Sequence, residues 1–163
     1  MIKYKLTDQN LQTHKGHQWT QGVEQVITKP GNTLCSDEVF HFYDSPEEAA
    51  LYNPIHADID NPILWEVECD QVVHDGTKGG AKRMTLVKQA SLPAISIDQR
   101  VQIAIRCVKL VYKEQKWNTW ADNWLSGKDR SEKSAAWAAE AMERAAAEGE
   151  IKRIIMKECL NVK

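Results

Sequence analysis

The stretch SIDQRVQIAIRCVKLVY, residues 96–112, decides the fold of this chain because the hydrophobic period changes within it. Ser96 and Gln99 form a capping-box pattern at the start of the stretch. Apolar residues then follow one stripe at helical spacing: Val101, Ala104, Ile105, Val108, Val111 and Tyr112. The pattern predicts an α+β protein, with a sheet region over residues 1–95 and a helical region over residues 96–163 that pack together as one unit.

The first region predicts a small mixed or antiparallel sheet with one short helix. Strand-like patterns rich in β-branched and aromatic residues occupy residues 23–28, 39–43, 63–69 and 82–88. A helix is expected after Ser45, which can cap it, because Pro46 suits the first helical position and Glu47 and Glu48 suit the positive end of the dipole. Asn53-Pro54 ends that helix. Asp75-Gly76 and Gly79-Gly80 are typical of turns.

The second region predicts a helical hairpin or a bundle of three to four helices. Trp117, Trp120 and Trp124 continue the apolar stripe until Gly127 supplies a stop. An alanine-rich helix over residues 135–147 contains Trp137, and residues 151–160 form a last amphipathic pattern. Two interpretations of the four tryptophans stay open. They form the core of an intramolecular hairpin, or they form a surface that binds a partner or a second copy of the chain.

Composition excludes several classes of protein. The chain has 163 residues, 42% of them hydrophobic and 27% charged, with a formal net charge of -2, which is typical of a folded globular protein. Lys and Arg are not clustered as phosphate-backbone binding requires, so nucleic acid is not an expected partner. The absence of a signal-peptide pattern and of a long apolar run predicts a cytoplasmic protein with reduced thiols and no membrane partner. The four cysteines have no metal-ligand spacing, so no metal is expected. No cofactor is predicted either.

No catalytic signature accompanies these elements, and no catalytic residue is assigned from the sequence. His41 alternates with Phe40 and Phe42, so it is expected on the opposite face of its strand. Glu66 and Glu68 project to one strand face, which is the geometry that paired carboxylates require and also that of any half-exposed strand. Residues 76–82 depart from the phosphate-binding loop pattern and favour a hairpin turn.

Several motifs together resemble a family of small accessory proteins encoded by tailed bacteriophages. The resemblance rests on residues 4–7 (YKLT), Gln18-Trp19-x-x-Gly22, Leu34-Cys35, residues 40–43 (FHFY), Leu51-x-Asn53-Pro54-Ile55-His56-Ala57 and residues 124–131 (WLSGKDRS). It implies a protein that acts in the host bacterial cytoplasm by binding, and that inhibits or modulates a host factor such as a defence component. The expected partner is a bacterial host protein. The alternative that the resemblance implies is sequestration of a small nucleotide signal.

A second resemblance is to ADP-ribosyltransferase-like proteins. The order of a strand, the segment over residues 42–52 and the strand over residues 64–68 is similar to their core, in which a nicotinamide dinucleotide lies between small sheets. The resemblance implies a ligand site at Tyr4, Lys5, His41, Tyr52 and Glu66 or Glu68. The family's nucleotide-binding strand and catalytic acid have no match here, which implies an inactive or repurposed version.

Overall fold

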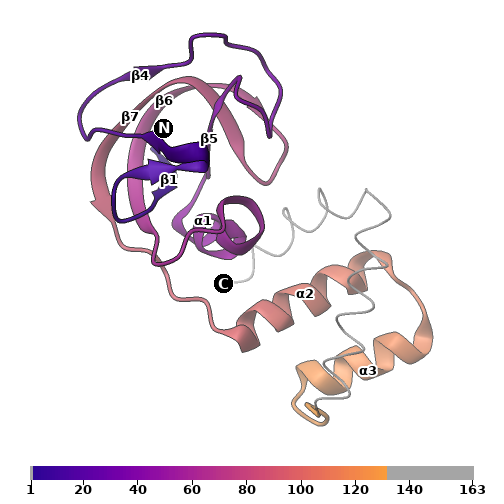
Figure 1. Cartoon of the computed structure of the whole chain (residues 1–163). Helices are drawn as coiled ribbons and strands as arrows, with labels where there is room; N and C mark the ends of the chain where they lie inside the picture. The colour runs from indigo at the N-terminus through magenta and orange to yellow at the C-terminus, as the bar shows by residue number, and fades with distance from the viewer. Residues whose placement is uncertain (1, 132–163) are drawn as a thin grey trace. The chain divides into compact units, whose positions relative to one another are not determined.

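A computed structural model describes residues 2–131 of the chain (Figure 1). The chain divides into two compact units, Met1–Ala94 and Ile95–Lys163. The predicted packing of the sheet region and the helical region as one unit stays a prediction.

The N-terminal unit contains an antiparallel five-stranded sheet, which confirms the α+β class. Its strands are β1 (Lys3–Thr7), β4 (Gln25–Val26), β5 (Phe40–Phe42), β6 (Ile63–His74) and β7 (Gly79–Ala90). β6 lies between β1 and β7, and both β4 and β5 pair with β7. A separate two-stranded sheet joins β2 (Gln12–Thr13) and β3 (His17–Gln18) around the single turn η1 (His14–Gly16).

The larger sheet closes on itself next to β5. Tyr43 N donates to Tyr4 O at 2.8 Å, and Tyr4 N donates to Tyr43 O at 2.9 Å, so the chain after β5 pairs back onto β1. The closure needs strong curvature, and β6 and β7 bend accordingly in Figure 1. The β6–β7 register shifts at three places. At one of them the Asp70 carboxylate accepts hydrogen bonds from the backbone N–H groups of Lys82 and Arg83. Such irregularities increase local twist and bending.

The start of β7 differs from the sequence prediction. Gly79 and Gly80 belong to the strand, and the turn lies before them, where Asp75 Oδ1 accepts from the backbone N–H of Thr77 at 2.8 Å and of Lys78 at 3.0 Å. A Cβ on Gly79 would lie 2.1 Å from the Phe42 ring, so the glycine serves close packing between β5 and β7. The strand expected over residues 23–28 is also shorter and is reduced to β4.

Large aromatic side chains fill the core of the sheet. Trp19, Phe42 and Trp65 are buried together with Met84 and Leu86. The Trp65 Nε1–H donates to Thr7 Oγ1 at 3.0 Å, which satisfies the buried indole.

The helix α1 (Pro46–Tyr52) begins as the sequence predicts. Ser45 Oγ accepts from Glu48 N at 3.1 Å, and Pro46 occupies the first turn. Glu48 Oε2 in turn accepts from Asp44 N at 2.8 Å. The chain then continues into η2 (Asn53–Ala57), a single π-type turn that ends at Asp58 in the left-handed region.

The described part of the C-terminal unit holds two helices in contact, α2 (Ile97–Val111) and α3 (Gln115–Leu125). The capping box of Ser96 and Gln99 is confirmed. The single continuous stripe expected through Trp124 is wrong, because the helix stops at Tyr112 and restarts at Glu114. The Glu114 carboxylate accepts from Lys116 N and Trp117 N and so caps a second helix. Gly127, with a positive φ, follows α3 at the predicted stop.

Ile105, Val108, Trp117, Ala121 and Trp124 form the buried cluster between α2 and α3. Lys109 and Asp122 add an ion pair across the two helices. The helices expected over residues 135–147 and 151–160 lie outside the described residues. Cys35 and Cys69 are free cysteines, Cys35 exposed and Cys69 half-buried.

Candidate functional site

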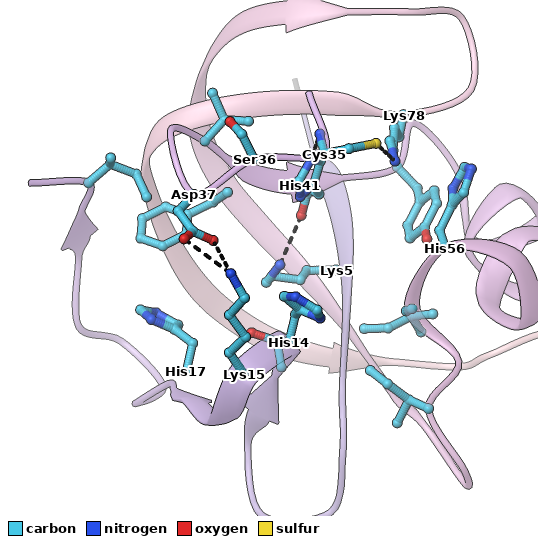
Figure 2. Close-up of a pocket in the computed structure, with 18 residues that line it drawn as sticks. Lys5, His14, Lys15, His17, Cys35, Ser36, Asp37, His41, His56 and Lys78 are labelled. Carbon is cyan, nitrogen blue, oxygen red and sulfur yellow. Dashed lines mark hydrogen bonds and ion pairs between the residues drawn. The ribbon is translucent and has the colours of Figure 1, made fainter. Parts of the chain in front are cut away.

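A pocket of about 740 Å³ opens in the N-terminal unit beside β1, β5 and η2 (Figure 2). Pockets of this volume are typical of small-molecule sites. Its lining comes from segments that are distant in sequence: Lys5, Leu6, Thr13, His14, Lys15, His17, Ile27, Cys35, Ser36, Asp37, Val39, Phe40, His41, Tyr43, His56, Ala57, Ile59 and Lys78.

The pocket lining carries a net positive charge, although the N-terminal region that forms it is net negative. Residues 1–96 hold 8 Lys and Arg against 13 Asp and Glu, a net charge of -5. The pocket wall holds three lysines, Lys5, Lys15 and Lys78, against one carboxylate, that of Asp37. The fold therefore gathers positive charge at this wall, and such a wall attracts anions.

Lys5 lies at the centre of this wall. It points inward from β1 and is only 8% exposed, its Nζ donates to His41 O at 2.9 Å, and the ammonium lies 4.9 Å from the centre of the Trp19 ring. Burial lowers the pKa of Lys5 to about 8, although the nearby Cys69 partly opposes the shift. No carboxylate in residues 2–131 forms an ion pair with Lys5.

His41 is held in its neutral form by burial and by neighbouring lysines. Burial lowers its pKa to about 4, and the charges of Lys5 and Lys78 contribute in the same direction. His41 Nε2 accepts from Cys35 N at 2.9 Å, so the proton of the neutral ring is on Nδ1. Lys78 Nζ lies 3.0 Å from Cys35 Sγ, and Figure 2 shows these groups together on one side of Lys5.

Aromatic rings form a further part of the site. The His56 ring stacks on Tyr52, with ring centres 5.0 Å apart and planes 15° apart, and on Tyr43, at 6.1 Å and 7°. Phe40 and Phe42 belong to the sheet core and His41 does not, although Phe40 also reaches the pocket lining next to His41. The stack holds the His56 ring in a fixed orientation beside η2, and Tyr43 and His56 both contribute to the pocket lining.

The opposite side of the pocket is more open. His14, Lys15 and His17 come from η1 and the start of β3, and Lys15 Nζ pairs with Asp37 at 3.2 Å where both side chains are exposed. The His17 ring packs on Trp19 and Phe40. In residues 2–131 no three His, Cys, Asp or Glu side chains are grouped as a metal ion would require.

The structure brings together only some of the residues that the ADP-ribosyltransferase resemblance indicated. Lys5 and His41 meet in the pocket, and Tyr52 supports it through His56. Tyr4 pairs with Tyr43 through the backbone and does not line the pocket. Glu66 and Glu68 also lie outside the lining, and Glu66 pairs with Lys88 at 3.3 Å. The sequence analysis did not assign Lys78, Cys35 and His56 to one site. Lys78 lies in the turn before β7, and nothing in the sequence of that turn indicates that its side chain reaches the pocket.

The tryptophans predicted as partner-binding residues occupy different environments. Trp117 and Trp124 are buried in the α2–α3 cluster, and Trp120 packs against that cluster while partly exposed. Trp137 lies outside the described residues.

Acidification is expected to destabilise the N-terminal unit through His41. In the unfolded chain His41 takes up a proton near pH 6.5, whereas the folded protein resists it down to about pH 4, so the unfolded state binds more protons within that window. The free energy of unfolding should fall by up to about 3 kcal/mol as the pH drops from 6.5 to 4. Urea titrations of the wild type and of His41→Gln at several pH values would measure it.

The His41→Gln protein should lose less stability on acidification, because glutamine does not titrate and its amide oxygen can still accept from Cys35 N. Lys5, Lys78, His56 and Asp75 are the charged or titratable neighbours of His41 and are the same in both proteins. Identical acid slopes in the two proteins would contradict the assignment.

Comparison with known protein families gives a match, and it covers the N-terminal unit. No curated protein and no solved structure matches the chain. Residues 1–98 match a family described as a domain of unknown function (DUF7666). The match spans well over half of the chain and contains every residue that lines the pocket. The chain therefore belongs to the DUF7666 family.

Proposed function

We propose that the N-terminal unit binds a small anionic ligand of the nucleotide class, and that the protein acts by holding this ligand rather than by converting it. The observation that carries the proposal is Lys5, a buried ammonium that lines a pocket and has no carboxylate partner among the described residues. A buried charge is costly unless it is paired, so an anion in the pocket would supply the missing partner.

Three further observations support a nucleotide. Lys78 adds a second positive charge near His41, and a phosphate between two lysines would gain charge-assisted hydrogen bonds. Tyr43 and His56 bring aromatic side chains to the lining, against which a base can pack. The volume of about 740 Å³ suits a ligand of nucleotide size. Binding is favoured over conversion because the paired acids of the ADP-ribosyltransferase reading, Glu66 and Glu68, do not line the pocket.

The resemblance to tailed-phage accessory proteins gives this proposal a setting. A phage protein that withdraws a nucleotide signal in the bacterial cytoplasm would modulate a host response, for example a defence response. Inhibition of a host protein by direct contact stays the other prediction. It depended on exposed tryptophans, and the burial of Trp117 and Trp124 gives it less support than the pocket gives to ligand binding. Self-association through the alanine and tryptophan helices also stays a prediction. None of the helices in residues 2–131 is long and apolar enough to cross a bilayer.

The proposal is tested by calorimetric titration of the full chain with a panel of mononucleotides, cyclic nucleotides and dinucleotides. At least one should bind with a Kd in the micromolar range or tighter, and its affinity should fall as salt rises. Lys78→Met should weaken that affinity by roughly 10-fold or more, because a hydrogen bond to a charged group contributes about 1.5–3 kcal/mol.

Lys82→Met is the matched control, since Lys82 follows Lys78 by four residues and does not line the pocket. An equal effect of both substitutions, or no binding below millimolar ligand, would refute the proposal. The enzymatic alternative is tested with the same samples. They are incubated with the nicotinamide dinucleotide and then analysed for released nicotinamide.

A further inference from the structure

Two lysines on β1 have the same burial but different partners. Lys3 and Lys5 point to the same face of the strand, and each is 8% exposed. Lys3 Nζ lies 2.5 Å from Asp44 Oδ1. Lys5 Nζ instead contacts a backbone carbonyl and the face of Trp19, and it lines the pocket, whereas Lys3 does not.

These surroundings raise the fraction of Lys5 that is a neutral amine, although the ammonium still predominates at neutral pH. Neither a carbonyl oxygen nor an indole ring offers a formal negative charge to an ammonium, and burial removes water from it. With a pKa of about 8, roughly a tenth of Lys5 is unprotonated at pH 7, a far larger fraction than for a lysine with the ordinary pKa of 10.5. An unprotonated lysine amine in a desolvated pocket is a nucleophile toward carbonyl groups.

We propose that Lys5 captures an aldehyde that also carries an anionic group, by forming an imine through its Nζ. The amine lone pair attacks the carbonyl carbon, the C–N bond forms, and the carbonyl oxygen gains a proton from the nitrogen to give a carbinolamine. The hydroxyl group then leaves with the second nitrogen proton as water, and the C=N bond forms. The step needs no oxidant or reductant, and it is reversible by hydrolysis.

The surroundings of Lys5 select the class of aldehyde. Once Lys5 is consumed in an imine, Lys78 still supplies a positive charge on the same side of the pocket, near His41. A phosphate or carboxylate on the aldehyde would pair with it. The inference rests on the proposed occupancy of this pocket by an anionic ligand and adds a covalent mode of holding one.

The test uses the full chain and pyridoxal 5′-phosphate, an aldehyde that carries a phosphate. The protein is incubated with it, reduced with borohydride to fix imines, digested, and analysed by mass spectrometry. Lys5 should be labelled at least roughly 10-fold faster than Lys3, which has the same burial, and faster than the exposed Lys88. Its labelling rate should reach half of its maximum near pH 8, whereas an ordinary lysine continues to gain reactivity toward pH 10.

Benzaldehyde, which lacks the anionic group, is the matched probe for the role of Lys78. Lys78→Met should slow the labelling of Lys5 by pyridoxal 5′-phosphate and leave its labelling by benzaldehyde unchanged. Labelling of Lys5 at the rate of Lys3, or a rate that still rises steeply above pH 9, would overturn the inference, and both can be read from the wild type without any variant.

The outcomes separate this inference from the proposed function. Nucleotide binding without selective labelling of Lys5 would overturn the inference and leave the proposed function standing. Selective labelling without any nucleotide binding would support the inference and refute the nucleotide class. Lys5→Arg keeps a positive charge but cannot form the imine, so nucleotide binding that survives this change while labelling is lost would support both.

Discussion

Lys5→Met is expected to raise the free energy of unfolding of the N-terminal unit by on the order of 2 kcal/mol at pH 7, while it abolishes ligand binding. A lysine whose pKa falls from 10.5 to about 8 on folding costs stability in proportion to the shift. Methionine keeps most of the volume and removes the charge. The lost hydrogen bond to His41 O and the lost contact with Trp19 offset part of the gain.

The sign of the effect follows from proton linkage. Between about pH 8 and pH 10.5 the unfolded chain holds a proton on Lys5 and the folded chain does not, so wild-type stability should rise with pH across this window. The cost is fully present below pH 8 and absent above pH 10.5. Lys5→Met should lack this rise. Hydrogen exchange of the β1 and β6 amides in urea would report on the N-terminal unit alone.

Lys3→Met is the matched control and should have the opposite effect. It removes the ammonium from the ion pair with Asp44 and leaves His74, whose Nε2 lies 3.1 Å from Asp44 Oδ2, as the remaining partner of that carboxylate, so it should destabilise the unit. If both substitutions destabilise the protein equally, then Lys5 is a structural lysine and not an unpaired charge kept for a ligand.

Trp124→Ala is expected to destabilise the described helical pair by about 3–5 kcal/mol, because it removes a large buried side chain from the α2–α3 cluster. The Trp124 side chain is 5% exposed, and the Arg130 guanidinium lies 4.7 Å from the centre of its ring. Loss of this ring leaves a cavity and removes a cation–π contact. Hydrogen exchange of the α2 amides as a function of urea would measure the change.

Trp120→Ala should cost clearly less, since Trp120 packs on the same cluster but is only partly buried. If Trp120→Ala destabilises the helices as much as Trp124→Ala does, the burial assigned to the two rings is wrong. Neither substitution touches the lining of the pocket, so nucleotide affinity should stay unchanged in both proteins.

Among the three α-helices of residues 2–131, local signals in the sequence predicted where α1 and α2 begin. Ser45 with Pro46, and Ser96 with Gln99, cap helices as their side chains indicate, because capping depends on residues three positions apart. The start of α3 was missed. Glu114 is an uncommon capping residue, and the apolar stripe continues across the break, so periodicity alone could not reveal it.

The candidate site was predictable only in part. Lys5 and His41 were named from a resemblance, and the structure places them in contact. Glu66 and Glu68 were named from strand periodicity and from the same resemblance. Periodicity places the two residues on one face of the strand, but it does not reveal which residues of other strands pack against that face. The role of Lys78 could not be predicted from the sequence, because Lys78 contacts Cys35, which lies 43 positions earlier in the chain.

The sequence by itself determined that this is an α+β protein, where its helices at Ser45 and Ser96 begin, and which residues are large and apolar. These properties depend on neighbours along the chain, whose distances are fixed by covalent geometry. Only the tertiary structure decided that β5 pairs with β7 while Tyr43 pairs with Tyr4. The pairing of Tyr43 with Tyr4 closes the sheet and buries Lys5 without a carboxylate partner among the described residues. It also gathers lysines at the pocket wall from a region that is acidic as a whole, because long-range strand pairing determines which side chains line the same pocket.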